Sequence, residues 1–290
     1  MKVLLTGAGG LVGGALAPLL TGIGHSITRV SHSQPWPELA GHDAVVHLAG
    51  ENIAAGRWTP ERKTRIRDSR AQMTRQLCET VTKLASPPRV IVCASAIGYY
   101  GNRGDEILRE ESAAGADFLA GVCRDWEAAT KPAVDAGIRV VNLRFGVILS
   151  ATGGALAKML TPFKLGLGGV IGGGQQWMSW IALDDAVGII IHALTDETLR
   201  GPVNVVASQP VTNREFAKTL GRVLRRPTAF PVPAFVLRLA LGEMADALLL
   251  SSQRVEPAKL VASGYKFRFP ELEGALRHLL SKQASQQRLL

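Results

Sequence analysis

Three glycines near the amino terminus have the spacing of a phosphate-binding turn. Gly7, Gly10 and Gly13 follow the apolar stretch KVLLTG at 2–7 and precede a segment with leucines at helical spacing. Backbone approaches a phosphate closely where glycine removes the side chain, and the free N–H groups at a helix start attract the anion. The place of the pattern, between a first strand and a first helix, makes it specific. The sequence therefore predicts a turn that binds the pyrophosphate of a dinucleotide.

The end of the second apolar stretch indicates which dinucleotide. A site for NAD usually places a carboxylate there, to bind the ribose 2′-hydroxyl. This chain has Val30-Ser31-His32-Ser33 instead, with no acidic residue before Glu38. Ser31, His32 and Arg29 are suited to a 2′-phosphate, so NADP is the predicted cofactor. The predicted cofactor contacts are Gly7, Gly10, Leu11, Val12, Gly13, Arg29, Ser31, His32, Leu48, Ala49, Gly50 and Glu51.

The elements that position this turn follow the rhythm of a parallel sheet. Apolar segments that read as strands alternate with segments of helical periodicity. The predicted strands are 2–7, 26–30, 43–50, 89–96, 139–149 and 202–206, and the later helices lie at about 60–84, 118–136 and 185–195. This order predicts an α/β fold of the Rossmann type, a doubly wound parallel sheet.

The alternation of predicted strands and helices ends near residue 207. Helical segments broken by prolines follow, without another strong strand. We expect a Rossmann domain over 1–206 and a smaller, mostly helical cap or substrate domain over 207–290. The segment 150–182 contains six glycines within 166–174 and is expected to contribute to the substrate side. The alternative for these glycines is a pair of tight turns.

Composition excludes several classes of protein. No apolar run approaches the length of about 18 residues that a membrane span needs. The net charge is +9, and seven basic residues (57, 62, 63, 65, 67, 70, 75) face two acidic ones between Arg57 and Arg75. This run is either a solvated helix face or a surface that attracts an anionic ligand. No aromatic residue lies between 59 and 98, which argues against nucleic acid binding.

Cysteines and histidines indicate neither a disulfide framework nor a metal site. Cys78, Cys93 and Cys123 are odd in number and widely spaced, and Cys93 lies in an apolar run that predicts a buried side chain. The six histidines form no metal-binding pattern. A reducing, cytoplasmic location without a bound metal is expected.

Several motifs together resemble a known superfamily. TGAGGLVG, HLAGENI at 47–53, SAIGYYG at 95–101 and LRFGVIL at 143–149 resemble the extended short-chain dehydrogenase/reductases, which include nucleotide-sugar epimerases. The segments 162–187 and 210–217 and the C-terminal third are similar to the atypical "epimerase family" proteins of unassigned reaction. The resemblance implies the fold and NADP binding, but no particular reaction.

The proton-transfer pair of that superfamily is missing here. Active members carry a tyrosine and a lysine one helical turn apart, and the lysine lowers the pKa of the tyrosine. The corresponding helix, FLAGVCRDWEAA at 118–129, contains neither residue. The His-x-x-x-Arg pair often found in the atypical group would fall on Ala120 and Arg124, so half of it is absent.

A helical wheel places the buried stripe of this helix on Leu119, Val122, Trp126, Ala129 and Ala133. Ala120, Arg124 and Glu127 are expected on the opposite side, where Arg124 faces either a cofactor or water. An arginine stays charged and therefore cannot act as a general base near neutral pH. It can hold an anion or polarise a carbonyl group.

Other candidates for chemistry follow the strand at 89–96. Ser95 corresponds to the strand-end serine region of the superfamily, and Tyr99 and Tyr100 lie at the carboxyl end of the sheet, where open α/β folds bind ligands. The alternative for the two tyrosines is a structural turn with packed aromatic rings. Glu51 and Asn52 end another strand, where a carboxylate is a plausible base. Asp184 and Asp185 are expected to cap the next helix.

The sequence thus supports two hypotheses of different class. The first is a cytoplasmic NADP-binding atypical reductase, or a protein like the nucleotide-sugar epimerases, with an unknown small-molecule substrate. Its catalytic residues would be Ser95, Tyr99 and Tyr100, with Arg124 as electrostatic support. The second is a catalytically silent binding or regulatory protein that responds to NADP(H). Either would work as a monomer or a homodimer, without nucleic acid or membrane.

Overall fold

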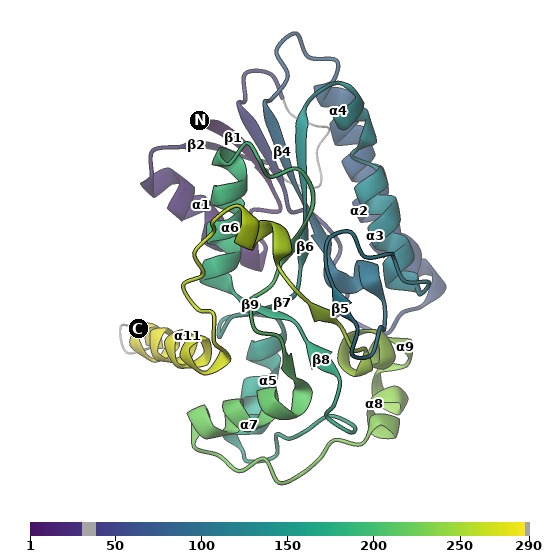
Figure 1. Ribbon diagram of the computed structural model, residues 1–290, viewed down its shortest axis with the longest axis vertical. Helices are drawn as coiled ribbons and strands as arrows, with labels where there is room; N and C mark the ends of the chain where they lie inside the picture. The colour runs from purple at the N-terminus through teal and green to yellow at the C-terminus, as the bar shows by residue number, and fades with distance from the viewer. Residues whose placement is uncertain (31–38, 288–290) are drawn as a thin grey trace.

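A six-stranded parallel sheet forms the centre of the molecule (Figure 1). The computed structural model describes residues 1–30 and 39–287, so the predicted contacts Ser31 and His32 lie outside it. The order of the strands is β10-β6-β4-β3-β1-β2, and all neighbours are parallel. Their bounds are β1 (Lys2–Thr6), β2 (Ser26–Val30), β3 (Ala44–His47), β4 (Val90–Ala96), β6 (Arg139–Phe145) and β10 (Gly201–Val205). The predicted Rossmann-type fold is confirmed.

Helices cover both faces of this sheet (Figure 1). Helices α1 (Leu11–Gly22) and α6 (Leu183–Thr195) pack on one face, in the same apolar cluster as Val3 and Leu5 of β1. The other face belongs to a second cluster, in which Leu4 packs with residues of α2 (Pro60–Val81) and α4 (Lys131–Asp135). The strands are apolar on both sides because both sides are covered.

The start of α2 shows the capping chemistry that its residue types favour. The Thr59 side chain accepts a hydrogen bond from the Arg62 N–H at 3.3 Å, and Pro60 occupies the first turn. Both features favour a helix start at this point, because they satisfy or remove backbone donors that have no partner inside the helix.

Two predicted elements are divided in the structure. The helix expected over 118–136 is two helices, α3 (Phe118–Ala128) and α4, because Pro132 lies in the first turn of α4 and has no N–H to continue the first helix. The strand expected over 139–149 divides at Gly146, and β7 (Val147–Leu149) leaves the main sheet to pair with β9 (Trp180–Ala182). A Cβ at Gly146 would lie 2.5 Å from the Ser179 carbonyl oxygen, so this crossing requires glycine.

Further helices and two-residue strands lie outside the main sheet, and we call the described residues from 207 onward the C-terminal part. These elements are α5 (Gly154–Lys164), β8 (Trp177–Met178), β11 (Val211–Thr212), α7 (Asn213–Leu224), α8 (Ala234–Leu241), α9 (Glu243–Ala245), a π-helical turn η2 (Asp246–Leu250), β12 (Arg254–Val255), α10 (Ala258–Ala262) and α11 (Leu272–Gln287). Strand β12 pairs with β5 (Ile107–Leu108), which follows the 3-10 turn η1 (Ile97–Tyr100) after β4. This pairing returns the C-terminal part to the carboxyl end of the sheet.

Within the part of the chain that the structure describes, no helix combines the length and the apolar character needed to cross a membrane.

Candidate functional site

The glycine turn between β1 and α1 is packed too tightly for other residues. Gly7 has a φ of +72°, and a Cβ there would lie 2.7 Å from the Leu48 carbonyl carbon. A Cβ at Gly13 would lie 2.2 Å from the Gly7 carbonyl oxygen. Gly10 is the N-cap of α1, and no side chain caps this helix. The N–H groups at the start of α1 are therefore available to a ligand.

This turn lies where the strand order reverses. Strand β1 has β2 on one side and β3 on the other, and the chain passes from one face of the sheet to the other at this point. Open α/β sheets bind ligands outside the carboxyl ends of their strands at such a switch point. The tight contact of Gly7 with Leu48 joins the ends of β1 and β3 at the same place.

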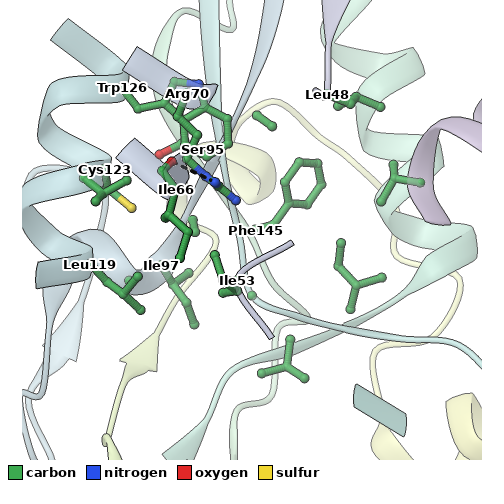
Figure 2. Close-up of a pocket in the computed structure, with 18 of the residues that line it drawn as sticks. Leu48, Ile53, Ile66, Arg70, Ser95, Ile97, Leu119, Cys123, Trp126 and Phe145 are labelled. Carbon is green, nitrogen blue, oxygen red and sulfur yellow. Dashed lines mark hydrogen bonds between the residues drawn. The ribbon is translucent and has the colours of Figure 1, made fainter. Parts of the chain in front are cut away.

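A cavity of about 460 Å³ opens there, as Figure 2 shows. The glycine turn forms one wall, and the ends of β4 and β6 contribute Ala94, Ser95 and Phe145. Helices α2 and α3 supply Ile66, Arg70, Leu119, Val122, Cys123 and Trp126, and the C-terminal part supplies Ala247, Leu248 and Gln253. The cavity thus lies between the sheet and the C-terminal part.

Half of the predicted cofactor contacts line this cavity. They are Gly7, Gly10, Leu11, Val12, Gly13 and Leu48. Ala49, Gly50 and Glu51 follow β3 but do not line it, and Arg29 is an exposed residue of β2. The preference for a 2′-phosphate rested on Arg29 together with Ser31 and His32, and it stays a prediction.

Arg70 of α2 was missed as a site residue. Its Nη2 donates to the Glu51 carbonyl at 2.9 Å, its Nη1 donates to the Ile66 carbonyl at 3.0 Å, and its guanidinium lies 5.1 Å from the Trp126 ring centre. Burial lowers the pKa of Arg70. One signal was present in the sequence: Arg70 lies one turn after Ile66, on the apolar side of a basic helix.

Ser95 lines the cavity and belongs to a buried polar network. Its Oγ donates to Glu127 Oε1 at 2.7 Å, and Glu127 accepts from Nε and Nη2 of Arg144, both at 2.8 Å. The Arg144 side chain is 3% exposed and that of Glu127 is 13% exposed, so this ion pair is buried. We call these three residues the Ser95 network. It holds the Ser95 hydroxyl in one orientation beside the cavity.

The two tyrosines after β4 support this network from outside the cavity. Tyr100 is fully buried, donates to Asn204 Oδ1 at 2.7 Å and accepts from Arg144 Nη1 at 2.9 Å. Burial raises the pKa of Tyr100 to about 12. The Arg144 guanidinium lies 3.5 Å from the Tyr99 ring centre. Neither tyrosine lines the cavity, and both have the packing expected of the structural alternative.

Helix α3 presents an apolar face to the cavity. This face consists of Leu119, Val122, Cys123 and Trp126, and burial raises the pKa of the Cys123 thiol to about 12. Arg124 is exposed, with Nη1 3.4 Å from the Gly115 carbonyl, and does not line the cavity. Neither of the two positions that the resemblance suggested, 120 and 124, therefore lines the cavity.

The predicted orientation of α3 was wrong for two residues. Ala120 is fully buried, and Glu127 points inward to Arg144. The helical wheel assumed one covered side, but α2 packs against α3 as well: the Trp126 Nε1 donates to Thr74 Oγ1 of α2 at 3.0 Å. A helix covered on two sides buries residues that a single apolar stripe leaves out.

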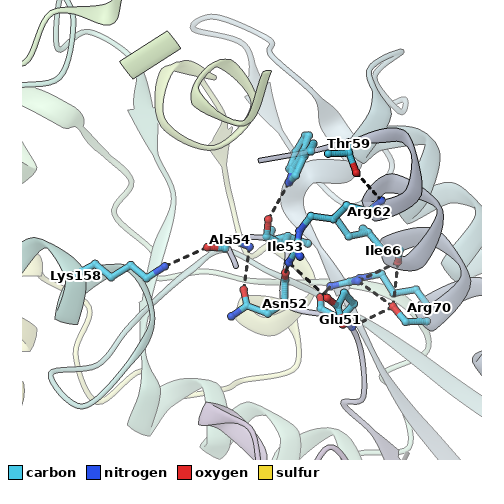
Figure 3. A network of polar contacts seen from close by, with 11 residues as sticks. Glu51, Asn52, Ile53, Ala54, Thr59, Arg62, Ile66, Arg70 and Lys158 are labelled. Carbon is cyan, nitrogen blue, oxygen red and sulfur yellow. Dashed lines mark hydrogen bonds and ion pairs between the residues drawn. The ribbon is translucent and has the colours of Figure 1, made fainter. Parts of the chain in front are cut away.

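The loop after β3 is tied to two helices (Figure 3). Arg62 donates from Nη2 to the Asn52 carbonyl at 2.6 Å and lies 3.5 Å from the Glu51 carboxylate. Lys158 of α5 donates to the Ala54 carbonyl at 3.3 Å. The Glu51 carboxylate therefore pairs with Arg62 instead of lining the cavity, whereas Ile53 of the same loop does line it. The geometry gives no support to Glu51 as a base.

Two further expectations are corrected. Asp185 does not cap α6: it is fully buried and accepts the N–H groups of Arg268 and Phe269 at 2.8 and 3.0 Å, which ties the C-terminal part to this helix. The glycines within 166–174 do not line the cavity. A Cβ at Gly169 would lie 1.8 Å from the Phe230 carbonyl oxygen, so close packing accounts for this glycine.

A second cavity of about 320 Å³ adjoins the first and shares Leu119 and Ala247 with it. Trp58 and Phe118 form an edge-to-face pair in its wall, with 5.3 Å between the ring centres. Glu243 pairs with Lys63, and Asp246 pairs with Arg238 at 2.8 Å. This cavity extends the site toward the C-terminal part.

Comparisons with known proteins agree with this architecture. Residues 3–206 match the NAD dependent epimerase/dehydratase family, and residues 232–279 match a domain of unknown function, DUF1731. The human epimerase family protein SDR39U1 is 38% identical over 294 residues, covering 97% of this chain and all of that protein. The Mycobacterium bovis epimerase family protein Mb2239 is 39% identical over 296 residues, covering 97% of this chain and 98% of that protein.

Solved structures show the same relationship. The crystal structure of human SDR39U1 (isoform 2) with NADPH has a TM-score of 0.90 and 38% identity, covering 96% of this chain and 99% of that one. A nucleoside-diphosphate sugar epimerase from Corynebacterium glutamicum has a TM-score of 0.80 and 38% identity, covering 99% of this chain and 61% of that one. The predicted resemblance is confirmed: the chain belongs to the NAD dependent epimerase/dehydratase family.

Proposed function

We propose that this protein binds NADPH in the cavity at the β1–α1 turn. The observation that carries the proposal is the glycine turn at the switch point, where Gly13 leaves no room for a Cβ and the free start of α1 opens onto the cavity. The human relative that was crystallised with NADPH supports the choice of cofactor.

The position of the turn sets the direction of the cofactor. Its pyrophosphate would lie at the start of α1, and its adenosine would extend toward the end of β2. The nicotinamide would then lie toward the ends of β4 and β6, beside Ser95 and Phe145. When bound, NADPH supplies a hydride, and the residues around it orient the ring and exclude water.

A reductase or epimerase reaction on a small molecule follows as the first candidate. Ser95 is the hydroxyl that lines the cavity, and the Ser95 network fixes its direction. Tyr99 and Tyr100 would act indirectly, because their contacts with Arg144 hold Glu127 against Ser95. Arg124 has no place in this proposal, since it lies on the exposed side of α3. The substrate would enter through the adjoining cavity.

The apolar face of α3 favours a second candidate, an NADPH-binding protein without turnover. Its cavity residues, Leu119, Val122, Cys123 and Trp126, offer no proton donor at neutral pH. In either case we place the cofactor domain at 1–206 and the cap at 207–290. A cytoplasmic location suits the three buried free cysteines, and the proposed partners are small molecules, with the chain as a monomer or homodimer.

Calorimetric titration with NADPH and NADH, followed by a carbonyl substrate screen, tests the proposal. NADPH should bind at least about tenfold more tightly than NADH, a difference of about 1.4 kcal/mol. Loss of turnover in Ser95→Ala with NADPH binding intact would establish the enzyme, and Tyr99→Phe should have a smaller effect. Binding without turnover in the screen favours the second candidate. Absence of binding by either nucleotide rejects both.

A further inference from the structure

Arg70 brings a charge into a cavity that is otherwise uncharged. Among the lining residues within the described ranges, Arg70 is the one that carries a formal charge at neutral pH. Three of its five N–H groups are fixed, by the carbonyls of Glu51 and Ile66 and by the Ser69 hydroxyl, and Trp126 covers its plane. One N–H on Nε and one on Nη2 donate to no residue of the described chain. Figure 2 shows the side chain among the residues around Ser95.

No carboxylate forms an ion pair with Arg70 within the described chain, although the charge of Glu51 acts on it from a longer distance. Across 1–30 and 39–287, no carboxylate oxygen lies within the ion-pair distance of 4.0 Å of Arg70. The two closest candidates in the site are already paired: Glu51 lies 3.5 Å from Arg62, and Glu127 is bound by Arg144. These two pairs cancel, so the local charge beside the cavity is that of Arg70. A guanidinium stays protonated in such surroundings because its pKa starts so high.

The location of Arg70 matches the nicotinamide half of the proposed cofactor. Its guanidinium stacks on Trp126 of α3, and both residues line the cavity with Ser95 at the end of β4. The adenosine half would lie on the other side of the glycine turn, toward β2. The apolar walls around Arg70, such as Ile66 and Phe145, exclude water and reduce the screening of its charge.

The two redox forms of the cofactor differ in charge at this place. The nicotinamide ring of NADP⁺ carries a positive charge, whereas the ring of NADPH is neutral, and the phosphates are the same in both. A fixed cation in a cavity of low polarity disfavours a second cation nearby. We propose that Arg70 makes this site selective for the reduced cofactor, NADPH, over NADP⁺. This inference rests on the proposed function.

The test is a comparison of dissociation constants by calorimetry. NADPH, NADP⁺ and 2′,5′-ADP, which lacks the nicotinamide half, are titrated into wild type, Arg70→Gln and Arg65→Gln. Arg65 is an exposed arginine of the same helix and serves as the matched control. Wild type should bind NADPH about tenfold or more tightly than NADP⁺. A tenfold ratio means that the reduction potential of the bound NADP⁺/NADPH couple lies about 30 mV above that of the free couple.

Arg70→Gln should reduce this ratio to about threefold or less, while Arg65→Gln keeps it. Affinity for 2′,5′-ADP should stay the same in all three proteins, which also shows that the site is folded. Arg70→Lys retains a charge and should keep most of the ratio, and Arg70→Met, which also removes the charge, replaces the glutamine variant if that variant does not fold. An equal affinity of wild type for NADPH and NADP⁺, or an unchanged ratio in Arg70→Gln, overturns the inference. Failure of wild type to bind NADPH overturns the proposed function instead.

Discussion

The close packing of the cofactor turn depends most directly on Gly13. Its helix can approach the end of β1 only because position 13 has no side chain: a Cβ would lie 2.2 Å from the Gly7 carbonyl oxygen. The neighbouring Gly14 differs, since a Cβ there would lie 3.7 Å from the Ala8 carbonyl oxygen, at an ordinary contact distance. The two glycines therefore make a matched pair for mutation.

We expect Gly13→Ala to weaken NADPH binding by more than about tenfold, a loss of about 1.4 kcal/mol, because α1 must move away from the turn. Gly14→Ala should leave NADPH binding unchanged and stabilise the protein by about 0.5–1 kcal/mol, as alanine does within a helix. Calorimetric titration and urea unfolding measure both effects. Similar losses of binding in the two variants would show that the turn does not depend on this contact.

Glu127 is the residue that joins Ser95 to Arg144, and its loss should be costly. Glu127→Gln leaves the Arg144 guanidinium, which is 3% exposed, without its carboxylate. Removal of one partner of a buried ion pair destabilises proteins by about 3–5 kcal/mol. Asp135→Asn, which removes the exposed partner of Lys131, is the control and should have little effect. Equal urea midpoints for the two variants would contradict a structural role for the Ser95 network.

Because Tyr100 is buried, we expect the folded protein to lose stability at high pH. Burial raises its pKa to about 12 in the folded protein, against about 10 in the unfolded chain. Below pH 10 both states hold the proton; from pH 10 to 12 the unfolded chain releases it first, so the free energy of unfolding falls, by up to about 3 kcal/mol. Tyr100→Phe should flatten this fall in urea titrations between pH 9 and 11.5. Tyr99→Phe, which keeps the Tyr100 hydroxyl, should retain it, and a profile of Tyr100→Phe as steep as wild type would refute the assignment.

At the scale of elements, the segment after the π-helical turn η2 closes the cavity. Ser252 fixes it: its Oγ donates to the Gly104 carbonyl at 2.7 Å and accepts from the Trp177 N–H at 3.0 Å. The adjacent Gln253 lines the cavity and donates to the carbonyls of Ile97 and Gly101. Ser252 therefore connects the C-terminal part to the loop after β4 and to strand β8.

Ser252→Ala should destabilise the protein by about 1–3 kcal/mol, since the Gly104 carbonyl and the Trp177 N–H lose their partner in a buried place. NADPH binding should weaken as well, because Gln253 loses its support. Urea unfolding and limited proteolysis near residue 252 detect the two consequences. Ser251→Ala is the control, as that hydroxyl has no hydrogen bond within the described structure, and the interpretation fails if both variants lose the same stability.

The whole molecule should respond to the cofactor as one unit. The C-terminal part holds the sheet through β12 and β5, and Lys63 and Arg57 near the start of α2 reach Glu243 and the Ala240 carbonyl. NADPH at 100 times its dissociation constant should stabilise the protein by about 2.7 kcal/mol. Differential scanning calorimetry should show a single transition that moves up by about 5–10 °C. Two transitions, of which only one moves, would show that the two parts unfold separately.

Features that depend on neighbours along the chain could be predicted from the sequence alone. The strands of the main sheet, the glycine turn and the cap of α2 by Thr59 and Pro60 follow from spacing and residue type, because strand and helix periods and caps are set within a few residues. The family motifs are local in the same sense. These features were sufficient to predict the Rossmann-type sheet and the place of the cofactor turn.

Contacts between residues far apart in the chain could not be predicted in this way, because they arise only when the whole chain packs. Arg70 became a cavity residue because the Glu51 carbonyl and Trp126 of another helix hold its side chain inward. Ser95 met Glu127 across 32 positions, and Tyr100 met Asn204 across 104. Ala120 is buried, although a single apolar stripe leaves it out. Periodicity shows that a side is covered, but the identity of the partner depends on how the whole chain packs, and the chemistry of this site lies in those partners.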